Sequence, residues 1–353
     1  MKRHRRALIT GITGQDGSLL AEFLLGKGYE VHGLVRWDAV DTTQRLKTHN
    51  DAYRKLSLHF ADMTDALALA RLIAEIRPAE IYNLAALSHV QVSFETPAAA
   101  LTTNALGTQY LLEAVRVLDM AGSVRIYQAS SSEMFGSIPA PQNENSAFAP
   151  CSPYAIAKLA AYWTARMYRD AYGMHVSNGI LFNHESPVRG EDFVTRKITR
   201  AVAAIEAGRQ DVLTLGNLDS VRDWGHARDY VEGIWLMLQQ EVPDDYVLAT
   251  GKAHSVRDFT ARAFARIGVN LVWEGSGAVE TGKDPKTGRV LVKVDPALFR
   301  PREVHYLLGD ASKARKNLGW RPKIGFDELI GEMVSADREA LRNGEEESWR
   351  MAG

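Results

Sequence analysis

The first half of the chain alternates short, β-branched apolar runs with longer runs whose apolar residues recur about every 3.6 positions. The short runs predict strands at residues 6–10, 30–35, 80–84, 124–129 and 176–182. The longer runs predict helices at residues 18–26, 66–76, 104–120 and 154–172. Strands separated by helices of this length form parallel βαβ units. We therefore predict an α/β fold with a Rossmann-type, doubly wound parallel sheet.

The second half of the chain is less regular. It predicts helices at residues 195–207, 227–240 and 257–267, and a surface loop at 275–289, which is rich in Gly, Lys, Thr and Asp. No linker separates the two halves, so we expect a smaller α/β domain interleaved with the first. The expected dinucleotide-binding domain covers residues 1–183 with returning segments near 223–252, and the expected substrate-binding domain covers 184–222 and 253–340.

Three glycines follow the first predicted strand and open the first predicted helix. Gly11, Gly14 and Gly17 have no β-carbon, so the chain can turn tightly and its backbone can approach a pyrophosphate. The helix N-terminus then presents free N–H groups and a positive dipole end to the phosphates. An ordinary glycine-rich turn is the alternative, but the strand before and the helix after favour a dinucleotide site.

The end of the second predicted strand bears on the choice between NADP and NAD. Arg36 favours NADP, because an arginine at this position binds a 2′-phosphate, whereas an acidic residue binds the ribose hydroxyl of NAD. Asp38 follows closely, so NAD stays open. Further along, Asp62 and Met63 are placed to flank the adenine, and the small residues Ala85 and Ala86 to lie beneath the cofactor or simply to pack the strand.

Tyr154 and Lys158 lie one helical turn apart on the same face of a predicted helix. A positive charge beside a phenol favours the phenolate, so Tyr154 can act as a base near neutral pH. The preceding strand ends in three serines at 130–132, whose hydroxyls would lie where a substrate oxygen needs a donor. Two amphipathic residues on a helix surface are the alternative, but the whole set is typical of a short-chain dehydrogenase.

Glu133 adds a carboxylate that a plain reductase or epimerase of this type does not need. Once C4 of a sugar is oxidised to a ketone, the proton on C5 becomes acidic. A carboxylate can remove this proton and then return a proton to the C6 hydroxyl as it leaves. This residue therefore favours a 4,6-dehydratase, and a helix-capping or solvent-facing glutamate is the alternative.

Longer segments carry a resemblance over nearly the whole chain. The most specific are residues 179–187, 193–197, 215–217, 222–225 and 299–304. On these segments the chain resembles the GDP-mannose 4,6-dehydratases, a family of extended short-chain dehydrogenases. The resemblance implies that Tyr154 is the base for the C4 hydroxyl, that Lys158 lowers its pKa, and that Glu133 is the C5 base and C6 acid. It also implies that Ser131 replaces a threonine that binds the sugar near O4.

The resemblance further implies two sets of binding residues. Contacts with the GDP-sugar are expected from Ser88, Ser131, Glu133, Asn183, Val194, Lys197, Leu215, Gly216, Arg222, Arg300 and Glu303. Contacts with the cofactor are expected from Gly11, Thr13, Gly14, Gln15, Asp16, Gly17, Arg36, Asp62, Met63, Leu84, Ala85, Ala86, Ser88, Ala129, Tyr154, Lys158, Leu181, His184 and Arg189. Surface ion pairs are the alternative for Arg222 with Asp223 and for Arg300 with Glu303.

The chain departs from the family at several positions. Trp37 stands where the family has a second arginine, which puts strict NADP preference in doubt. Leu87 replaces a glutamine and Cys151 an arginine, both expected near the sugar. A pocket without those polar groups could accept a larger sugar, so GDP-D-glycero-D-manno-heptose is an alternative substrate. A GDP-4-keto-sugar reductase or epimerase, and a non-catalytic NADP sensor, are further alternatives that Glu133 and the intact Tyr154 and Lys158 disfavour.

Composition narrows the remaining classes. Lys and Arg total 42 against 43 for Asp and Glu, which argues against a nucleic-acid partner or an anionic membrane. The basic run at 2–6 precedes too short an apolar stretch for a signal peptide, and no apolar run could span a membrane. The single cysteine favours a reducing, cytoplasmic location. The ten histidines show no metal-ligand spacing, so no metal is expected. The resemblance implies a homodimer or homotetramer.

Overall fold

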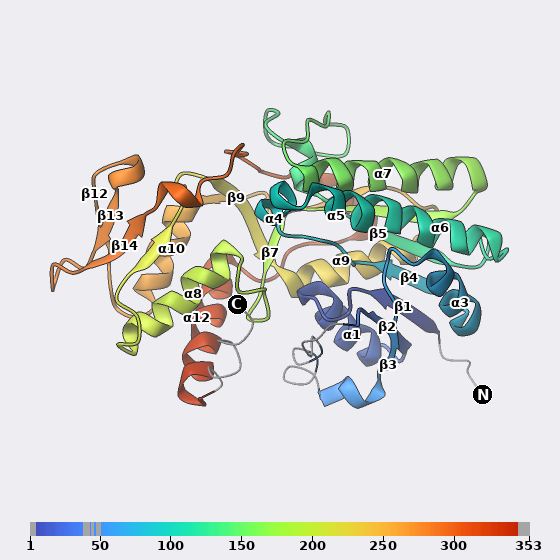
Figure 1. Ribbon diagram of the computed structural model, residues 1–353, viewed down its shortest axis with the longest axis horizontal. Coiled ribbons are helices and arrows are strands. Elements are labelled where there is room, and N and C mark those ends of the chain that lie inside the picture. Colours follow the sequence, from blue (N-terminus) through green and yellow to red (C-terminus); the bar gives the residue numbers. More distant parts are fainter. Residues whose placement is uncertain (1–4, 38–42, 44–45, 47–50, 345–353) are drawn as a thin grey trace.

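The computed structural model describes residues 5–37, 43, 46 and 51–344. A seven-stranded sheet forms the larger lobe, in the order β10-β6-β5-β4-β1-β2-β3 (Figure 1). Its strands are β1 (Arg6–Thr10), β2 (Glu30–Val35), β3 (Ser57–Phe60), β4 (Glu80–Asn83), β5 (Arg125–Ser131), β6 (His175–Leu181) and β10 (Tyr246–Leu248). All neighbouring strands of this sheet pair in parallel. The predicted Rossmann-type parallel sheet is therefore confirmed.

Helices cover both faces of this sheet. One face carries α1 (Gln15–Gly26) and α9 (Ala227–Gln239), and the other carries α3 (Ala66–Ile76), α6 (Gly107–Val117) and α7 (Pro153–Tyr172). Successive residues of a strand point to opposite faces, so Ile9 packs in the core with α1 and α9 while Leu8 packs in the core with α3 and α6. Both faces are buried, which explains the continuous apolar runs in the sequence.

The smaller lobe has a core of its own. It contains α8 (Val194–Glu206), α10 (Val256–Ala265), α12 (Phe326–Arg342) and a four-stranded sheet of β12 (Val272–Glu274), β13 (Thr281–Lys283), β14 (Val290–Val294) and β8 (Leu213–Leu215). A second small sheet joins β11 (Ala253–Ser255), β9 (Val221–His226) and β7 (Asn183–Glu185). After β9 the chain returns to the larger lobe, because α9 covers the large sheet and β10 pairs with β6. The division into a dinucleotide-binding and a substrate-binding domain at the predicted residues stays a proposal.

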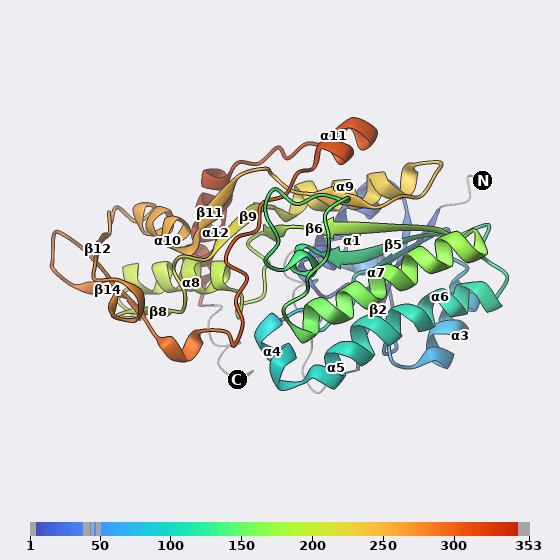
Figure 2. The same cartoon turned by 90° about the horizontal axis from the view of Figure 1, so that it is seen from above.

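The remaining described helices are α4 (Val90–Glu95), α5 (Pro97–Leu101) and α11 (Ser312–Leu318). The helices α5 and α6 follow one another along the chain, and both lie alongside α7 (Figure 2). Among the described helices, none combines the length and apolar character that a membrane span needs.

Two expectations about secondary structure are wrong in detail. The helix expected at residues 104–120 is divided into a π-helical segment, Thr102–Leu106, and α6. The loop expected at 275–289 contains β13, in which Thr281 pairs with Lys293 of β14. This strand has three residues, too few for a period of two to show in the sequence.

Candidate active site

A cavity of about 590 Å³ lies at the carboxyl ends of the central strands and reaches into the smaller lobe. It collects every residue expected to bind the GDP-sugar, and ten of those expected to bind the cofactor: Asp16, Leu84, Ala86, Ser88, Ala129, Tyr154, Lys158, Leu181, His184 and Arg189. The other expected cofactor residues follow the ends of β1 to β4 or begin α1 at the same edge of the sheet. In parallel α/β sheets this edge is where ligands bind.

The loop after β1 is held tightly against the loop after β4. Thr10 accepts hydrogen bonds through Oγ1 from the backbone N–H groups of Leu84 and Ala85, both at 3.1 Å. Gly11 has a φ of +69°, and a β-carbon there would lie 2.8 Å from the backbone of Ala85. A β-carbon on Gly17 would lie 2.3 Å from the carbonyl oxygen of Gly11. Only glycine fits this crossing, which leaves the N-terminus of α1 open to a dinucleotide pyrophosphate.

Asp16 joins the glycine loop to the smaller lobe through a partly buried ion pair. His184 Nε2 lies 2.8 Å from Asp16 Oδ2, and the imidazole donates through Nδ1 to the carbonyl oxygen of Phe182 at 2.7 Å. Burial by itself would raise the pKa of Asp16, but His184, together with Arg189 and Gln15, outweighs it and lowers this pKa to about 2. Although burial opposes it, the charge of Asp16 raises the pKa of His184. The pair therefore fixes one wall of the cavity against the expected cofactor site.

Gln15 strengthens the same connection. Its side chain donates to the carbonyl oxygen of His184 at 3.0 Å and accepts from the hydroxyl of Ser186 at 2.8 Å. Two successive residues at the start of α1 are thus tied to the segment that follows β6. The structure gives Gln15 this positioning role in addition to the cofactor contact expected from the sequence.

The candidate catalytic phenol is buried at the start of α7. Burial raises the pKa of Tyr154 to about 12, and the largest opposing effect is its hydrogen bond with the Ser131 hydroxyl. Lys158 donates through Nζ to the carbonyl oxygen of Ala129 at 3.0 Å and lies 5.9 Å from the centre of the Tyr154 ring. Burial lowers the pKa of Lys158 to about 8. In this geometry Ser131 therefore lowers the pKa of Tyr154 most, whereas the sequence assigned that role to Lys158.

Glu133 lies beside the phenol. It follows β5 in a short 3₁₀ turn that Ser131 caps by accepting a hydrogen bond from the Glu133 N–H at 3.2 Å. Its side chain lines the cavity, and its charge raises the pKa of Tyr154. The cap is Ser131, so the carboxylate is not occupied in capping this turn. A phenol and a carboxylate, the two groups expected to act as bases, therefore face the same cavity.

Cationic side chains gather at the other end of the cavity. Arg222 is buried and donates through Nη2 to Glu303 Oε1 at 2.9 Å, and Arg300 donates to the same oxygen at 3.3 Å. Lys197 of α8 also lines the cavity, and burial lowers its pKa. A β-carbon on Gly216 would lie 2.9 Å from the carbonyl oxygen of Leu298, so only a glycine lets these segments approach. Such a cationic cleft suits a nucleoside diphosphate.

The alternative of a surface ion pair between Arg222 and Asp223 is wrong. The buried Asp223 carboxylate accepts hydrogen bonds from the backbone N–H groups of Thr250 at 2.9 Å and Gly251 at 2.8 Å. Arg222 points the other way, toward Glu303, as expected for neighbouring residues of the strand β9. Asp223 therefore joins the lobes, while Arg222 faces the cavity.

Leu87 and Cys151 are not among the described residues that line the cavity, although Ser88, which follows Leu87, is. The backbone of Leu87 exchanges two hydrogen bonds with the side chain of Asn104. Cys151 donates to the carbonyl oxygen of Ala149 at 3.3 Å. These contacts give both residues a structural role, and their position near the sugar stays a prediction.

The adenine end is less completely described. Arg36 follows β2, and the indole of Trp37 makes an edge-on contact with Phe60, with ring centres 5.2 Å apart. Asp62 accepts two hydrogen bonds from Thr64, and Met63 is buried. Asp38, which bears on the choice between NAD and NADP, lies outside the described residues.

Several residues that line the cavity were not predicted from the sequence. They include His89, Gln91, Asp192, Phe193, Asn217 and Leu298. Each lies in a short helix or loop that only the tertiary structure brings to the site. For His89 there was a signal, since it directly follows the segment 84–88 that was assigned to the cofactor and the sugar.

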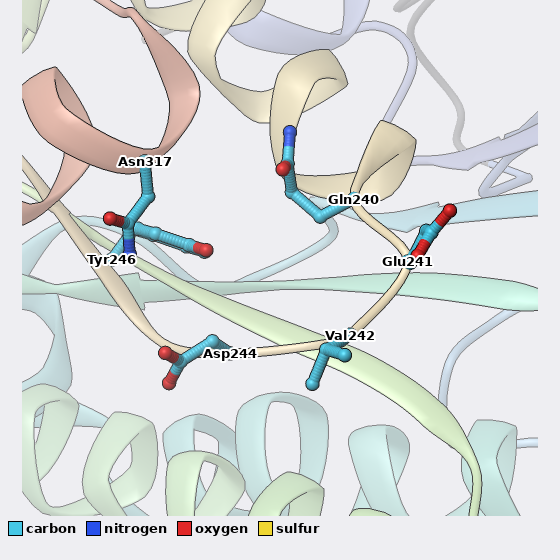
Figure 3. A pocket seen from close by; sticks show the side chains of 6 residues that line it. All are labelled: Gln240, Glu241, Val242, Asp244, Tyr246 and Asn317. Atoms are coloured by element: carbon cyan, nitrogen blue, oxygen red, sulfur yellow. The ribbon is translucent and has the colours of Figure 1, made fainter.

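A second depression lies at the opposite edge of the large sheet (Figure 3). It is lined by Gln240, Glu241, Val242, Asp244, Tyr246 and Asn317. Tyr246 begins β10, so this is the amino end of a parallel strand, where ligand sites are not expected. Its carboxylate Asp244 is paired with Lys313 at 2.6 Å. Within the described part of the chain, no cluster of side chains is suited to bind a metal ion.

Comparisons with known proteins agree with this geometry. The sequence model of the family GDP-mannose 4,6 dehydratase matches residues 8–333. The GDP-mannose 4,6-dehydratase of Sinorhizobium fredii (strain HH103) is 55% identical over 347 residues, which cover 97% of this chain and 99% of that protein. The human GDP-mannose 4,6 dehydratase is 51% identical over 344 residues, covering 95% and 92%.

Solved structures show the same fold. The dTDP-glucose 4,6-dehydratase DesIV from Streptomyces venezuelae, crystallised with NAD, superposes with a TM-score of 0.78 at 27% identity. The superposition covers 95% of this chain and 97% of that one. The family match spans both lobes and the whole cavity, and it confirms the resemblance seen in the sequence. The chain belongs to the GDP-mannose 4,6-dehydratase family.

Proposed function

We propose that this protein is an enzyme that converts GDP-mannose to GDP-4-keto-6-deoxymannose. One observation carries the proposal: Tyr154, Ser131 and Glu133 meet at one end of a cavity whose other end holds Lys197 and Arg222. A substrate with its diphosphate at the cations would extend its sugar toward the phenol and the carboxylate. The named relatives that are about half identical to this chain act on GDP-mannose by their names, which supports the mannose substrate over the heptose.

Each of these side chains has its own role in the proposed reaction. Tyr154 takes the proton of the C4 hydroxyl, and Ser131 donates a hydrogen bond near O4. Glu133 then removes the proton from C5 and delivers a proton to the C6 hydroxyl, which leaves as water. A nicotinamide dinucleotide held by these residues would supply the hydride acceptor for C4 and the hydride donor for C6. As C6 is reduced, C5 takes up a proton from solvent and Tyr154 returns its proton to solvent, so the overall change is the loss of one water without net oxidation. Lys158, Asp16 and the glycine loop fit such a cofactor, because the crossing at Gly11 and Gly17 leaves no room for side chains.

NADP is the cofactor that we propose, with NAD as the alternative. The support is Arg36 at the end of β2, where a guanidinium can bind a 2′-phosphate. Titrating the protein with NADP and NAD tests this, and Arg36→Ala should weaken NADP binding without affecting NAD. Equal affinity for both cofactors in the unchanged protein would overturn the preference.

We also propose a homodimer or homotetramer in a reducing, cytoplasmic compartment. The single cysteine supports the compartment. The support for an oligomer is a stripe of exposed apolar side chains on α7, formed by Ile156, Trp163 and Met167.

The decisive experiment incubates the purified protein with GDP-mannose and, separately, with GDP-manno-heptose. Mass spectrometry should show the loss of one water from GDP-mannose, without stoichiometric consumption of NADPH. GDP-mannose labelled with deuterium at C4 should give a product labelled at C6. Consumption of NADPH in step with turnover would instead indicate a reductase, and loss of water from the heptose alone would overturn the mannose assignment.

A further inference from the structure

His89 lines the catalytic cavity, and nothing in the mechanism above uses it. It occupies the position before α4, where its Nδ1 accepts a hydrogen bond from the backbone N–H of Val92 at 3.3 Å. A ring nitrogen that accepts a hydrogen bond carries no proton, so the proton of the neutral ring lies on Nε2. Nε2 has no hydrogen-bond partner among the described residues, so His89 is left with one unused donor.

The neighbours of His89 place it beside the reacting groups. One turn along α4, the buried Ser93 accepts through Oγ a hydrogen bond from the backbone N–H of Tyr154 at 3.1 Å. The short helix α4 is therefore fastened to the start of α7, which carries the catalytic phenol. This attachment fixes α4, and with it the position of His89 at its start, against the helix that carries Tyr154.

On its other side, His89 faces the smaller lobe. Its ring lies against that of Phe193, with ring centres 5.7 Å apart, and the guanidinium of Arg189 lies 3.6 Å above the same phenyl ring. Phe193 immediately precedes α8, which brings Lys197 to the cavity. His89 thus lies between the two ends of the cavity, with Tyr154 at one end and Lys197 at the other. The sugar of the proposed substrate would occupy this middle part.

We propose that the Nε2–H of His89 donates a hydrogen bond to a hydroxyl oxygen of the bound sugar and so orients the ring toward Tyr154 and Glu133. This inference rests on the proposed function. The role in capping α4 and the role in binding the sugar belong to different nitrogens of the same ring. The cap fixes the tautomer, and the tautomer makes the free nitrogen a donor rather than an acceptor.

Two substitutions separate these roles. In His89→Asn the amide oxygen takes the place of Nδ1 and keeps the cap, since asparagine is a good capping residue, but nothing reaches the position of Nε2. In His89→Gln the amide nitrogen can reach that position, but the cap is lost. A purely structural role predicts that Asn is the better replacement for both stability and activity. Sugar binding predicts that Asn is better for stability and Gln is better for activity.

The test measures kcat/KM for GDP-mannose, the affinity for GDP alone, and the melting temperature of each variant. We expect His89→Asn to melt like the unchanged protein but to lose kcat/KM about tenfold or more, as for one lost hydrogen bond to substrate. His89→Gln should melt lower and yet keep a kcat/KM well above that of the Asn variant. Affinity for GDP should stay within about twofold in both, because GDP lacks the sugar.

The inference is overturned if the Asn variant is at least as active as the Gln variant, or if affinity for GDP falls together with activity. An unchanged protein that fails to dehydrate GDP-mannose would instead overturn the proposed function. In that case, binding of unreacted GDP-mannose still tests His89, since the Asn variant should bind the sugar nucleotide more weakly while binding GDP normally.

Discussion

Glu133 is the side chain that separates elimination from simple oxidation. It lines the same cavity as Tyr154 and Ser131. Only its carboxylate can accept a proton from C5 of the sugar and pass one to the hydroxyl on C6. Glu133→Gln keeps the size and polarity of the side chain and removes its basicity. We expect the rate of water loss to fall by about 10²–10⁴-fold, the usual contribution of a general base, with little change in GDP-mannose binding.

Solvent exchange at C5 checks this prediction. In heavy water, the unchanged protein should place one deuterium at C5 of the product, and the Gln variant should leave C5 unexchanged. Glu95→Gln, a change to another carboxylate of the cavity, serves as the control and should cost less than about tenfold. Equal losses in the two variants would show that Glu133 is no more than one of several acidic groups lining the site.

The ion pair of Asp16 and His184 predicts a specific dependence of stability on pH. Asp16 has its pKa lowered from 3.8 to about 2, so its contribution is present above pH 3.8 and is lost as the pH falls through about 2. His184 has its pKa raised above 6.5, so its contribution is present below pH 6.5 and is lost as the pH rises through that raised value. Both contributions are therefore complete between pH 3.8 and 6.5.

A double-mutant cycle with Asp16→Asn and His184→Gln measures the pair. Urea unfolding near pH 5.5 should give a coupling free energy of about 0.5–3 kcal/mol, the range for side chains in one ion-pair network. Well above the raised pKa of His184 the coupling should become clearly smaller. A coupling that does not change with pH would show that the two side chains interact through packing alone.

At the scale of elements, the long periodic segments could be predicted from the sequence. The strand β1 and the helix α3 begin and end at the predicted residues, because their apolar patterns are long and, for α3, Asp65 caps the helix by accepting from the N–H of Ala68 at 2.9 Å. The three-residue strands of the smaller lobe could not be predicted, because pairing with distant segments determines them.

The residues of the candidate site also fall into those that the sequence predicts and those that it does not. Residues at the ends of large-lobe strands, such as Ser131 and Glu133, could be assigned from motifs, because the motif and the strand end coincide. Leu298 and Asp192 could not, because long-range packing brings them to the cavity. The influence of Ser131 on the pKa of Tyr154 is of this kind too: burial, which the sequence does not reveal, is the largest effect.

The loop between β1 and α1 allows a matched test of two glycines. A β-carbon on Gly17 would meet the Gly11 carbonyl oxygen at 2.3 Å, and one on Gly14 would meet the same oxygen at 3.3 Å. Gly17→Ala should therefore destabilise the fold by about 2 kcal/mol or more, since backbone has to move. Gly14→Ala should cost about 1 kcal/mol or less in stability but weaken dinucleotide binding, because the added methyl group faces the expected pyrophosphate.

Urea unfolding and titration with NADP measure the two effects separately. Only Gly17→Ala should be strongly destabilised, whereas a uniform sensitivity of the loop would predict equal losses for the two variants. If Gly14→Ala bound NADP as tightly as the unchanged protein, the pyrophosphate would have to lie elsewhere than at this loop.

At the scale of the whole molecule, α7 has an exposed apolar face that packs against nothing within the single chain. Ile156, Trp163 and Met167 recur at helical spacing on it and are 49%, 51% and 46% exposed. The neighbouring α5 and α6 run alongside α7, which makes this face broad (Figure 2). A stable dimer needs about 800 Å² from each chain, and helices packed against their copies can supply that area.

Charges on this face should therefore separate the chains. We expect the double variant Ile156→Glu and Met167→Glu to sediment as a monomer, because four carboxylates would meet across a two-fold axis without partners. Val279→Glu, at a position 76% exposed in the smaller lobe, is the matched control and should leave the oligomer intact. The start of α7 carries Tyr154, so separation should also lower the melting temperature and the activity. An oligomer that survives both charges on α7 would place the contact between subunits on another face.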